Sequence, residues 1–294
     1  MPHMHRRTFM AGLAAGLLQG ACPLFAAEAP RIVSLDYGLS STLLSLGVVP
    51  AGIADLADWH IWVVEPEMPP SVVDLGAAMQ VNFEVLAALK PDLILTTPYL
   101  EQLKPKLETV ATVLQLDIYA PDGGDILPKA IAATRKLGAA IGRTAEAEDF
   151  IGKAEATFDA CSARVNRAGP RPLALVNLLD ARHARIYSSP GLYDNVLARI
   201  GIPNAWTDKS NYWGFDTIGI EDLSKVRDPE ARLIIFEPVP PDALPTLAES
   251  PLWNTLPFSR PGGYAILPGA LMFGMVNEAV RFAGLVTDYL ETVS

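Results

Sequence analysis

The sequence has very little cysteine and histidine, and this shortage excludes several kinds of chemistry. Only two of the 294 residues are cysteine and four are histidine. Beyond an N-terminal stretch that we interpret below as an export signal, His60, His183 and Cys161 remain. A transition-metal site usually takes several such ligands, so we expect no metal held by the protein itself. One thiol forms no internal disulfide, so stability must come from a packed core.

The sequence also lacks the short motifs of common catalytic sites. It contains neither a G-x-S-x-G nucleophile elbow nor a G-x-x-x-x-G-K-S/T phosphate loop. Its many carboxylates include no pair whose spacing marks an acid and a base. We therefore expect a protein that is not an enzyme and has no cofactor. Catalytic groups that converge from distant loops leave an exported α/β hydrolase as a remote alternative.

Positive charge is scarce, because 33 acidic residues outnumber 23 basic ones and the formal net charge is −10. The first 26 residues hold two arginines and no acidic residue, so their removal takes this charge to −12. A chain this acidic is poorly suited to nucleic acid or to an anionic membrane surface, and we expect neither as a partner.

The first 26 residues have the layout of an export signal. Arg6-Arg7 is followed by Phe9-Met10 and then by an apolar run, Ala11 to Leu18, that is too short for a membrane span. The paired arginines resemble a twin-arginine signal, which predicts cleavage near Ala26 or Ala27 and a periplasmic protein. Gly20-Ala21-Cys22 leaves lipidation of Cys22 as an alternative.

After this stretch, apolar runs alternate with segments of helical periodicity, which predicts an α/β fold. The expected strands of the first half are 31–35, 51–54, 71–75, 92–97 and 113–117, and the expected helices are 40–46, 82–89, 101–110 and 125–140. This alternation predicts a mostly parallel sheet with helices on both faces.

The alternation restarts near residue 172. The expected strands are 172–178, 185–188, 232–237 and 264–267, and the expected helices are 192–200, 220–226 and 277–290. Glu84–Lys90 and Glu221–Arg227 place an acid, a leucine, an apolar residue and a base at the same offsets before a strand. This echo favours two related α/β lobes.

Between the two halves, residues 144–168 are predicted to form one long helix. Thr144 is the expected N-cap, and Gly169-Pro170 marks the end. Its apolar face is formed by Phe150, Ala154, Phe158, Cys161 and Val165. An ordinary helix within one lobe is the simpler interpretation. The two halves on either side favour a rigid connection, which at 1.5 Å per residue spans roughly 35–40 Å.

Aromatic residues gather in predicted loops. The densest groups are Trp59–Trp62 and Asn211–Phe215, while Tyr99 follows a strand and Phe273 precedes the last helix. Loops at the carboxyl ends of parallel strands are where α/β folds build ligand sites. We expect an aromatic-walled cleft for a bulky, partly apolar ligand. The alternative for each of these aromatic residues is that it only fills space at the edge of a lobe.

At these segments the sequence resembles the periplasmic iron(III)-hydroxamate (ferrichrome-type) siderophore-binding proteins of ABC importers. The matching segments are Leu46–Asp55, Trp62–Pro66, Ser71–Gly76, Gly201–Trp206, Asn211–Gly214 and Pro251–Trp253. The resemblance implies two Rossmann-like α/β lobes with mostly parallel sheets and a single long helix between them, the helical-backbone (class III) type. The implied division is an export signal 1–26, an N-terminal lobe 30–142, a linking helix 143–169 and a C-terminal lobe 170–294.

The resemblance further implies a solute-binding protein without catalytic activity. Such a protein captures a ferric siderophore between its lobes and delivers it to an ABC permease in the inner membrane, and the chelator holds the iron. We expect a monomer with a ferric hydroxamate as its ligand. Another iron chelate, haem or a cobalamin-like molecule are alternatives within this class. A scaffold or sensor subunit without a ligand is an alternative outside it.

The family's site residues carry over unevenly. Its cleft tryptophans and its chelate-contacting tyrosine match Trp62, Trp213 and, within one position, Tyr99. Its arginine, which faces the hydroxamate oxygens, falls at Ala78. Its aromatic pair before the last helix is reduced to Leu271 and Phe273.

Arg185 is our candidate for the missing cation, because the resemblance places it in a cleft-lining strand of the other lobe. Arg182 is the second candidate, and a solvated surface arginine is the simpler interpretation of Arg185. Glu101 and Glu221, one in each lobe, are the candidates for docking on the permease. A favourable charge at the start of a helix is the simpler interpretation of both.

Overall fold

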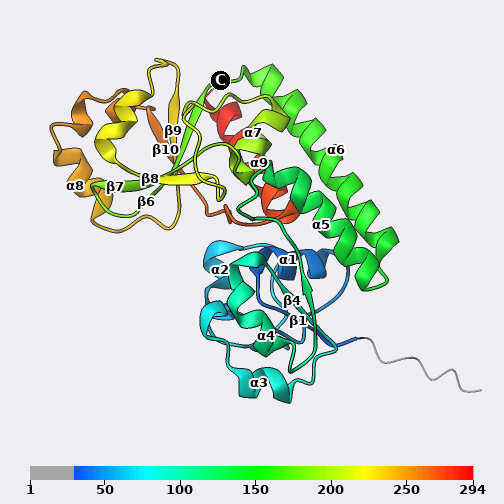
Figure 1. Cartoon of the computed structure of the whole chain (residues 1–294). Helices are drawn as coiled ribbons and strands as arrows, with labels where there is room; N and C mark the ends of the chain where they lie inside the picture. Colours follow the sequence, from blue (N-terminus) through cyan, green and yellow to red (C-terminus); the bar gives the residue numbers. More distant parts are fainter. Residues whose placement is uncertain (1–29, 294) are drawn as a thin grey trace, which may run out of the picture.

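The computed structural model describes residues 30–293, which form two α/β lobes joined by a layer of helices (Figure 1). The N-terminal lobe lies at the bottom of Figure 1 and the C-terminal lobe at the upper left, with the helical layer along the right. The predictions about the export signal and Cys22 concern residues outside the described range. Within 30–293, no helix is long and apolar enough to cross a membrane.

Five parallel strands form the sheet of the N-terminal lobe, in the order β3-β2-β1-β4-β5. Their bounds are β1 Ile32–Ser34, β2 Gly52–Ile53, β3 Val73–Asp74, β4 Leu93–Thr96 and β5 Thr112–Gln115. Each strand overlaps a predicted one, because a strand that is covered on both faces needs a continuous apolar run.

The helices of this half are more irregular than predicted, and all but α1 are shorter. The α-helices are α1 Tyr37–Ser45, α2 Trp59–Trp62, α3 Phe83–Ala88, α4 Lys104–Leu107 and α5 Ile126–Ala140, and the 3-10 helices are η1 Leu56–Asp58, η2 Ala78–Gln80 and η3 Pro98–Leu103. Helix α1 starts earlier than predicted because Asp36 caps it, accepting a hydrogen bond from Leu39 N at 3.0 Å. The single helix predicted over 101–110 is wrong. Pro105 has no amide hydrogen and is tolerated only in a first turn, so η3 ends and α4 begins there.

The C-terminal sheet is mixed, with strand order β10-β9-β6-β7-β8. Its strands are β6 Leu173–Leu178, β7 His183–Tyr187, β8 Phe215–Gly219, β9 Arg232–Phe236 and β10 Tyr264–Leu267. β6, β9 and β10 are parallel, whereas β7 runs antiparallel to both β6 and β8. The turn between β6 and β7 is only a few residues long, and a connection this short joins antiparallel strands. Strand β8 was not predicted.

The remaining elements of the second half cover this sheet and complete the helical layer. They are α7 Leu192–Ile200, η4 Ile220–Lys225, α8 Ala243–Glu249, η5 Trp253–Thr255, η6 Pro257–Ser259 and α9 Val276–Thr292. Helix α9 packs against α1 of the other lobe, where Asn277 Nδ2 donates a hydrogen bond to Ser41 O at 2.9 Å. The last helix therefore contacts both halves of the chain.

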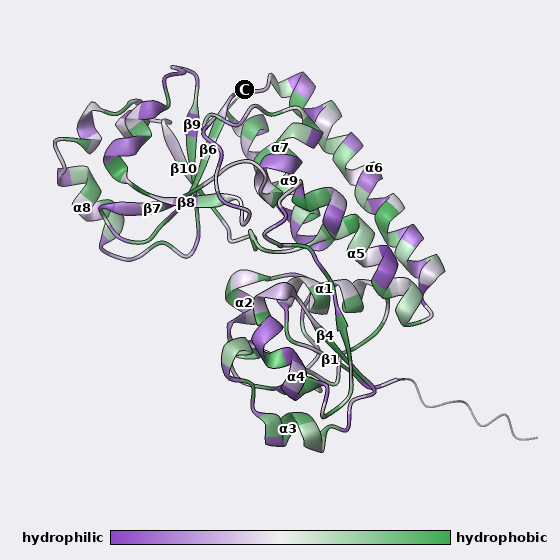
Figure 2. Ribbon diagram, in the orientation of Figure 1, coloured by the Kyte–Doolittle hydropathy of each residue, from purple (hydrophilic) through white to green (hydrophobic). Residues whose placement is uncertain are grey.

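The long helix α6 spans Thr144–Ala168, its predicted range of 25 residues. Its N-cap is Arg143, with no side-chain cap, so the prediction that Thr144 caps it is wrong; Gly169, at φ 86°, ends it. Hydrophobic and hydrophilic bands alternate along it (Figure 2), and its apolar face packs against α5, α7 and α9. Arg164 holds it to α9 through Asp288 and Glu291, each at 2.6 Å. We propose the division into 30–142, 143–169 and 170–294, with α9 shared between the two lobes.

Candidate functional site

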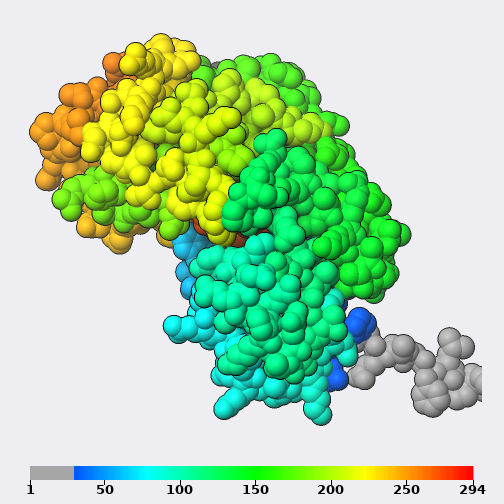
Figure 3. Space-filling model, viewed as in Figure 1, coloured from blue at the N-terminus to red at the C-terminus, as the bar shows by residue number. Residues whose placement is uncertain are grey.

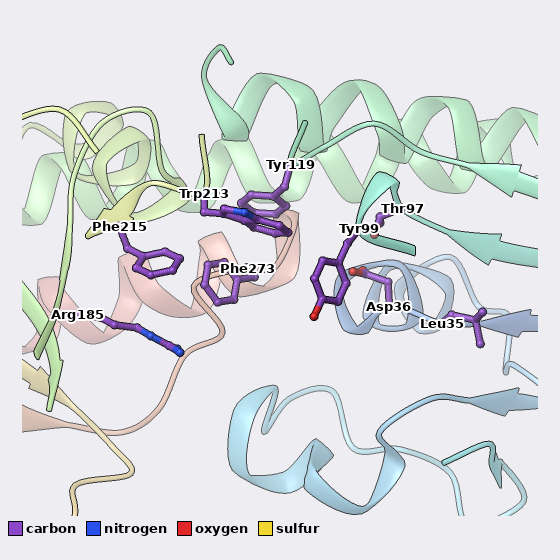
Figure 4. A pocket seen from close by; sticks show the side chains of 9 residues that line it. All are labelled: Leu35, Asp36, Thr97, Tyr99, Tyr119, Arg185, Trp213, Phe215 and Phe273. Carbon is purple, nitrogen blue, oxygen red and sulfur yellow. The ribbon is translucent and has the colours of Figure 1, made fainter. Parts of the chain in front are cut away.

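A cavity of about 410 Å³ lies where the two lobes meet, at the carboxyl ends of β1, β4 and β5. The surface is indented on one side at this junction (Figure 3). Both lobes contribute side chains (Figure 4), and the lining residues are Leu35, Asp36, Thr97, Tyr99, Tyr119, Arg185, Trp213, Phe215 and Phe273.

Two smaller cavities continue this space. One, of about 220 Å³, is lined by Asp36, Tyr37, Trp62, Arg185, Leu271, Met272 and Phe273. The other, of about 380 Å³, is lined by Trp62, Asn177, Leu178, Leu179, Arg185, Pro238, Val239, Pro240, Pro241 and Met272. Arg185 lines all three cavities, which we call together the cleft. Among residues 30–293, Arg185 and Asp36 are the only charged residues that line these three cavities.

Trp213 is the centre of the aromatic wall. Its ring stacks on Tyr119, with centroids 5.5 Å apart and planes at 17°. It also meets Tyr99 at 5.7 Å and Phe273 at 5.5 Å, both edge to face. These geometries are the favourable ones for aromatic pairs. The wall is therefore a packed unit that joins both lobes.

A tight turn fixes the backbone at Trp213. Asn211 Oδ1 accepts a hydrogen bond from Trp213 N at 2.8 Å. Gly214 has φ 79°, and a Cβ there would lie 2.0 Å from Gly191 Cα, so no other residue fits. This turn is the Asn-Tyr-Trp-Gly segment of the resemblance, whose glycine has no explanation in the sequence alone. The close approach of the two glycines supplies that reason.

Tyr119 belongs to the cleft but was missed. It is buried, and its hydroxyl lies 3.0 Å from the carbonyl oxygens of both Met272 and Gly274. These contacts fix the loop that carries Phe273. Burial raises the pKa of Tyr119 well above its ordinary value, so the phenol stays neutral. It follows β5 as Tyr99 follows the neighbouring β4, and the rule that selected Tyr99 also selects Tyr119.

Arg185 is the cation of the cleft. It lies on β7 and is half-buried, and its guanidinium carbon is 5.2 Å from the centre of the Phe215 ring on β8. Within residues 30–293, no carboxylate forms an ion pair with it. Arg182, our second candidate, is exposed and lines a separate pocket beside Glu221. Arg185, rather than Arg182, therefore faces the cleft.

Asp36 is the acid of the cleft, and sequence analysis missed it. Burial raises the pKa of this carboxyl from 3.8 to about 6. A second carboxyl, Glu278, is buried at the start of α9, where its Oε2 accepts a hydrogen bond from Met275 N at 2.7 Å. Burial raises the pKa of Glu278 to about 7, and the nearby Asp36 adds to this shift.

All five residues that we predicted to bind the ligand line the cleft: Trp62, Tyr99, Arg185, Trp213 and Phe273. Trp62 belongs to α2, so the prediction that Trp59–Trp62 is a loop is wrong; the helix has only four residues, too few for a periodic pattern. Ala78 lines none of the three cavities, and its amide donates to Asp55 Oδ2 at 3.3 Å.

The other predicted residues lie outside the cleft. Glu101 and Glu221 are exposed, one in each lobe. His60 and His183 are also exposed, and Cys161 is buried on α6 as a free thiol. Across residues 30–293, no three histidine, cysteine, aspartate or glutamate side chains are grouped so that they could hold a metal ion.

Known proteins are similar to this chain in sequence and architecture. The family model described as periplasmic binding protein matches residues 32–269. The iron(3+)-hydroxamate-binding protein FhuD of Escherichia coli is 28% identical over 291 residues, which cover 98% of this chain and 97% of FhuD. An achromobactin-binding periplasmic protein of Dickeya dadantii is 28% identical over 61% of this chain and 57% of its own length.

Solved structures agree with these matches. FhuD from Vibrio cholerae, crystallised with Fe3+-Desferal, superimposes with a TM-score of 0.84 at 25% identity and covers 90% of this chain and 99% of that one. FhuD2 from Staphylococcus aureus has the same fold, with a TM-score of 0.72 at 16% identity over 90% and 99% of the two chains. The predicted resemblance and the helical-backbone fold are confirmed. The chain belongs to the periplasmic binding protein family.

Proposed function

We propose that this protein is the solute-binding component of an ABC importer and that it captures a ferric siderophore of the hydroxamate type. The whole-length similarity to the E. coli iron(3+)-hydroxamate-binding protein supports the class of ligand. The cleft between the lobes, with its packed aromatic wall, supplies the kind of site that a bulky, partly apolar chelate requires.

The charged residues of the cleft favour a hydroxamate over a strongly anionic iron chelate. In the described part of the chain, one cation, Arg185, and one acid, Asp36, are the only charged residues that line it. Three hydroxamates around Fe³⁺ make a neutral complex, whereas three catecholates leave it with three negative charges. A strongly anionic chelate in a partly desolvated site needs several cations around it. The cleft matches a neutral chelate in this respect.

The aromatic rings and the polar groups of the cleft then have distinct roles. The rings of Trp213, Tyr119 and Phe273 contact the organic backbone of the chelate and remove it from water. Arg185 donates hydrogen bonds to the hydroxamate oxygens from the C-terminal lobe, where the family's arginine would have acted from the N-terminal lobe. Tyr99 is an exposed residue that lines the cavity, and its hydroxyl acts as a second donor. The chelator holds the iron, so the protein needs no ligand of its own for the metal.

We further propose that the protein is a periplasmic monomer, exported by the twin-arginine route, and docks on an inner-membrane permease through Glu101 and Glu221. Both acids are exposed and lie outside the cleft. An exposed acid on each lobe would let a permease bind a loaded protein without touching the ligand. Catalysis has no role in this cycle.

A comparison of the affinities for chelates of different charge tests the proposal. Quenching of tryptophan fluorescence is followed while the purified protein is titrated with a ferric trihydroxamate, a ferric tricatecholate, ferric citrate, haem and cobalamin. We expect the trihydroxamate to bind at least about 100-fold more tightly than the anionic chelates, which is about 2.7 kcal/mol. Tighter binding of a catecholate, haem or cobalamin would show that the hydroxamate assignment is wrong.

A further inference from the structure

The segment Leu271–Met275, directly before α9, carries one ring of the aromatic wall. Phe273 extends from this segment and meets the rings of Trp213 and Phe215, in each case with centroids 5.5 Å apart (Figure 4). The segment has no helical or strand hydrogen bonds of its own. The place of the Phe273 ring therefore depends on the side chains that hold the segment.

Tyr119 holds the segment from the N-terminal lobe. Its hydroxyl lies 3.0 Å from Met272 O and 3.0 Å from Gly274 O, and its ring meets Phe273 edge to face with centroids 6.0 Å apart. A phenol has one hydrogen and can donate fully to only one of these two carbonyl oxygens. A second contact is needed to fix the end of the segment.

Glu278 supplies this second contact from the first turn of α9. The residue is buried, and its Oε2 accepts a hydrogen bond from Met275 N at 2.7 Å. Its side chain also covers Gly274 so closely that an added Cβ on this glycine would collide with it. A glutamate at this position of a helix often reaches back to the cap residue. Here the same bond also fixes the last residues of the segment that carries Phe273.

The Glu278 carboxyl lies where a negative charge is costly. Within residues 30–293, its Oε1 is buried without a hydrogen-bond partner. Burial raises the pKa of Glu278 to about 7, and Asp36 adds to this shift, while Ser41 and the Met275 amide lower the pKa without offsetting burial. An ionised carboxylate with an unpaired oxygen gains by reaching water, and to do so it must release Met275 and Gly274.

The other titratable groups at this junction come from the elements that pack on α9. Asp36 caps α1, Tyr119 follows β5 and Tyr193 lies on α7, and burial raises the pKa of both phenols well above the ordinary value. On α9 itself Arg281 forms an ion pair with the loop after α2, and the ion pairs of α6 with α9 involve Arg164 at the far end of α9. Helix α5 packs on this layer through its buried apolar residues. Among residues 30–293, no cation forms an ion pair with Glu278.

We propose that Glu278 is a positioning residue of the ligand site: with Tyr119 it holds Leu271–Met275 in the arrangement that brings Phe273 to the aromatic wall, and this arrangement is lost when the carboxyl ionises. Only molecules with a protonated Glu278 then bind the chelate well, so the affinity falls as pH rises through about 7. This inference rests on the proposed function and adds a control of its site by pH.

Hydrogen exchange of the ligand-free protein tests the positioning role without any chelate. Exchange of the amides of residues 271–278 is compared between wild type and Glu278→Gln at the same pH, so that intrinsic exchange rates cancel. Glutamine can accept the hydrogen bond from Met275 N but cannot ionise. We expect wild type to exchange at least about 10-fold faster than the variant at pH 8 and this difference to be largely lost at pH 5. Equal rates at pH 8 would overturn the proposal.

A second variant removes the other contact. Tyr119→Phe keeps the ring but loses the hydroxyl that contacts Met272 O and Gly274 O. Exchange of residues 271–278 should be faster in this variant than in wild type already at pH 5. If Glu278→Gln does not fold, as its thermal melting curve would show, Tyr119→Phe still decides whether the segment is held in this way. Wild-type exchange in Tyr119→Phe would contradict it.

Binding shows whether the positioning reaches the ligand. A ferric trihydroxamate without other charged groups stays neutral between pH 6 and pH 8 and is titrated at both values, at a temperature where every variant is folded. We expect wild type to bind about 10-fold more weakly at pH 8 than at pH 6. Glu278→Gln should bind equally at both, because loss of stability alone does not change the affinity of folded protein. Phe273→Ala should also remove the pH dependence, because it removes the ring that the segment positions.

Asp36→Asn is the control for the other buried acid, since asparagine caps a helix as well as aspartate does. It should keep the decline in affinity and move it to lower pH, because the Asp36 charge no longer raises the pKa of Glu278. Loss of the decline in Asp36→Asn together with its persistence in Glu278→Gln would assign the effect to Asp36 and overturn the proposal.

The failures of the two proposals are distinguishable. A decline that persists in Glu278→Gln or in Phe273→Ala would overturn the positioning role and leave hydroxamate binding intact. If the trihydroxamate binds at neither pH, the proposed function fails, and hydrogen exchange in the ligand-free protein still decides the role of Glu278.

Discussion

Arg185 and Phe215 lie on adjacent antiparallel strands, β7 and β8, and the guanidinium carbon of Arg185 is 5.2 Å from the centre of the Phe215 ring. The ring holds the cation over the cleft and leaves its charge intact, whereas a carboxylate would neutralise it. Asn177 is the backbone partner of Arg185 on β6, and its side chain is fixed by Tyr187, whose hydroxyl donates to Asn177 Oδ1 at 2.8 Å. Arg185 therefore projects from a rigid, buried strand surface.

The first prediction concerns this arginine. Arg185→Ala should weaken binding of a ferric trihydroxamate by about 1.5–3 kcal/mol, the scale of a hydrogen bond to a charged group. Arg182→Ala is the matched control, because Arg182 is close in sequence but exposed outside the cleft. Calorimetric titration of both variants measures the difference. Wild-type affinity in Arg185→Ala would mean that aromatic contact and the tyrosine hold the chelate without this arginine.

The second prediction concerns the aromatic wall. Trp213→Ala should cost about 1–3 kcal/mol of binding, because the lost ring lines the 410 Å³ cavity and stacks on the Tyr119 ring with centroids 5.5 Å apart. Trp62→Ala should cost less, because Trp62 lines only the two smaller cavities. Tyr264→Ala, an exposed ring outside the cleft, is the control. Unchanged affinity in both tryptophan variants would show that these rings are structural plugs.

The aromatic wall also indicates how far sequence reasoning reaches. Tyr99, Trp213 and Phe273 were found because each lies in a segment that follows a strand or resembles the family. Tyr119 and Asp36 occupy equivalent places after β5 and β1 but stand alone in their segments. A single residue carries no periodicity, so its place after a strand was its one sequence signal, and the sheet order, with β1, β4 and β5 adjacent, shows that these places meet.

The secondary structure was likewise predictable from the sequence only in part. The helix α6 was predicted over its whole length because a long amphipathic pattern between two stops is unambiguous. The strand β8 was missed because Phe215–Gly219 contains Asp216 and Thr217 and has little apolar character. This segment is a strand because it pairs with β7, and that pairing is not local in sequence.

The third prediction concerns pH. Burial raises the pKa of Glu278 from 4.5 to about 7 and that of Asp36 from 3.8 to about 6. Between pH 5 and pH 8 the folded protein therefore binds more protons than the unfolded chain. The free energy of unfolding must fall as pH rises through this window, and the contribution of both groups is complete only below their unfolded pKa values.

Glu278→Gln tests this directly, because glutamine can still accept the hydrogen bond from Met275 N. The variant should be more stable than wild type at pH 8, by an amount on the order of 3 kcal/mol for a shift of this size. At pH 4 the two proteins should be similar. Urea unfolding at each pH measures the slope, and an equal slope in both proteins would show that Glu278 does not titrate in this range.

The fourth prediction is limited motion. A continuous α6, bound to α9 through the Arg164 ion pairs and to α7 through Arg199, resists the hinge bending that flexible connections permit. Small-angle scattering curves with and without a bound chelate should nearly superimpose. A clear decrease in the radius of gyration on binding would contradict a rigid connection.

The fifth prediction separates docking from ligand binding. Glu101 lies on η3 and Glu221 on η4, and both are exposed at positions that do not line the cleft. Charge reversal, Glu101→Arg or Glu221→Arg, should place like charges against the permease and strongly reduce iron uptake in cells, while the affinity of the purified protein for the chelate stays at the wild-type value. The matched controls are Glu108→Arg and Glu249→Arg, which reverse exposed acids elsewhere in the same lobes and should leave uptake intact. Loss of chelate affinity in the Glu101 or Glu221 variant would assign that residue to the ligand site. Unchanged uptake in both would leave these acids as favourable charges near the starts of short helices and move the docking surface elsewhere.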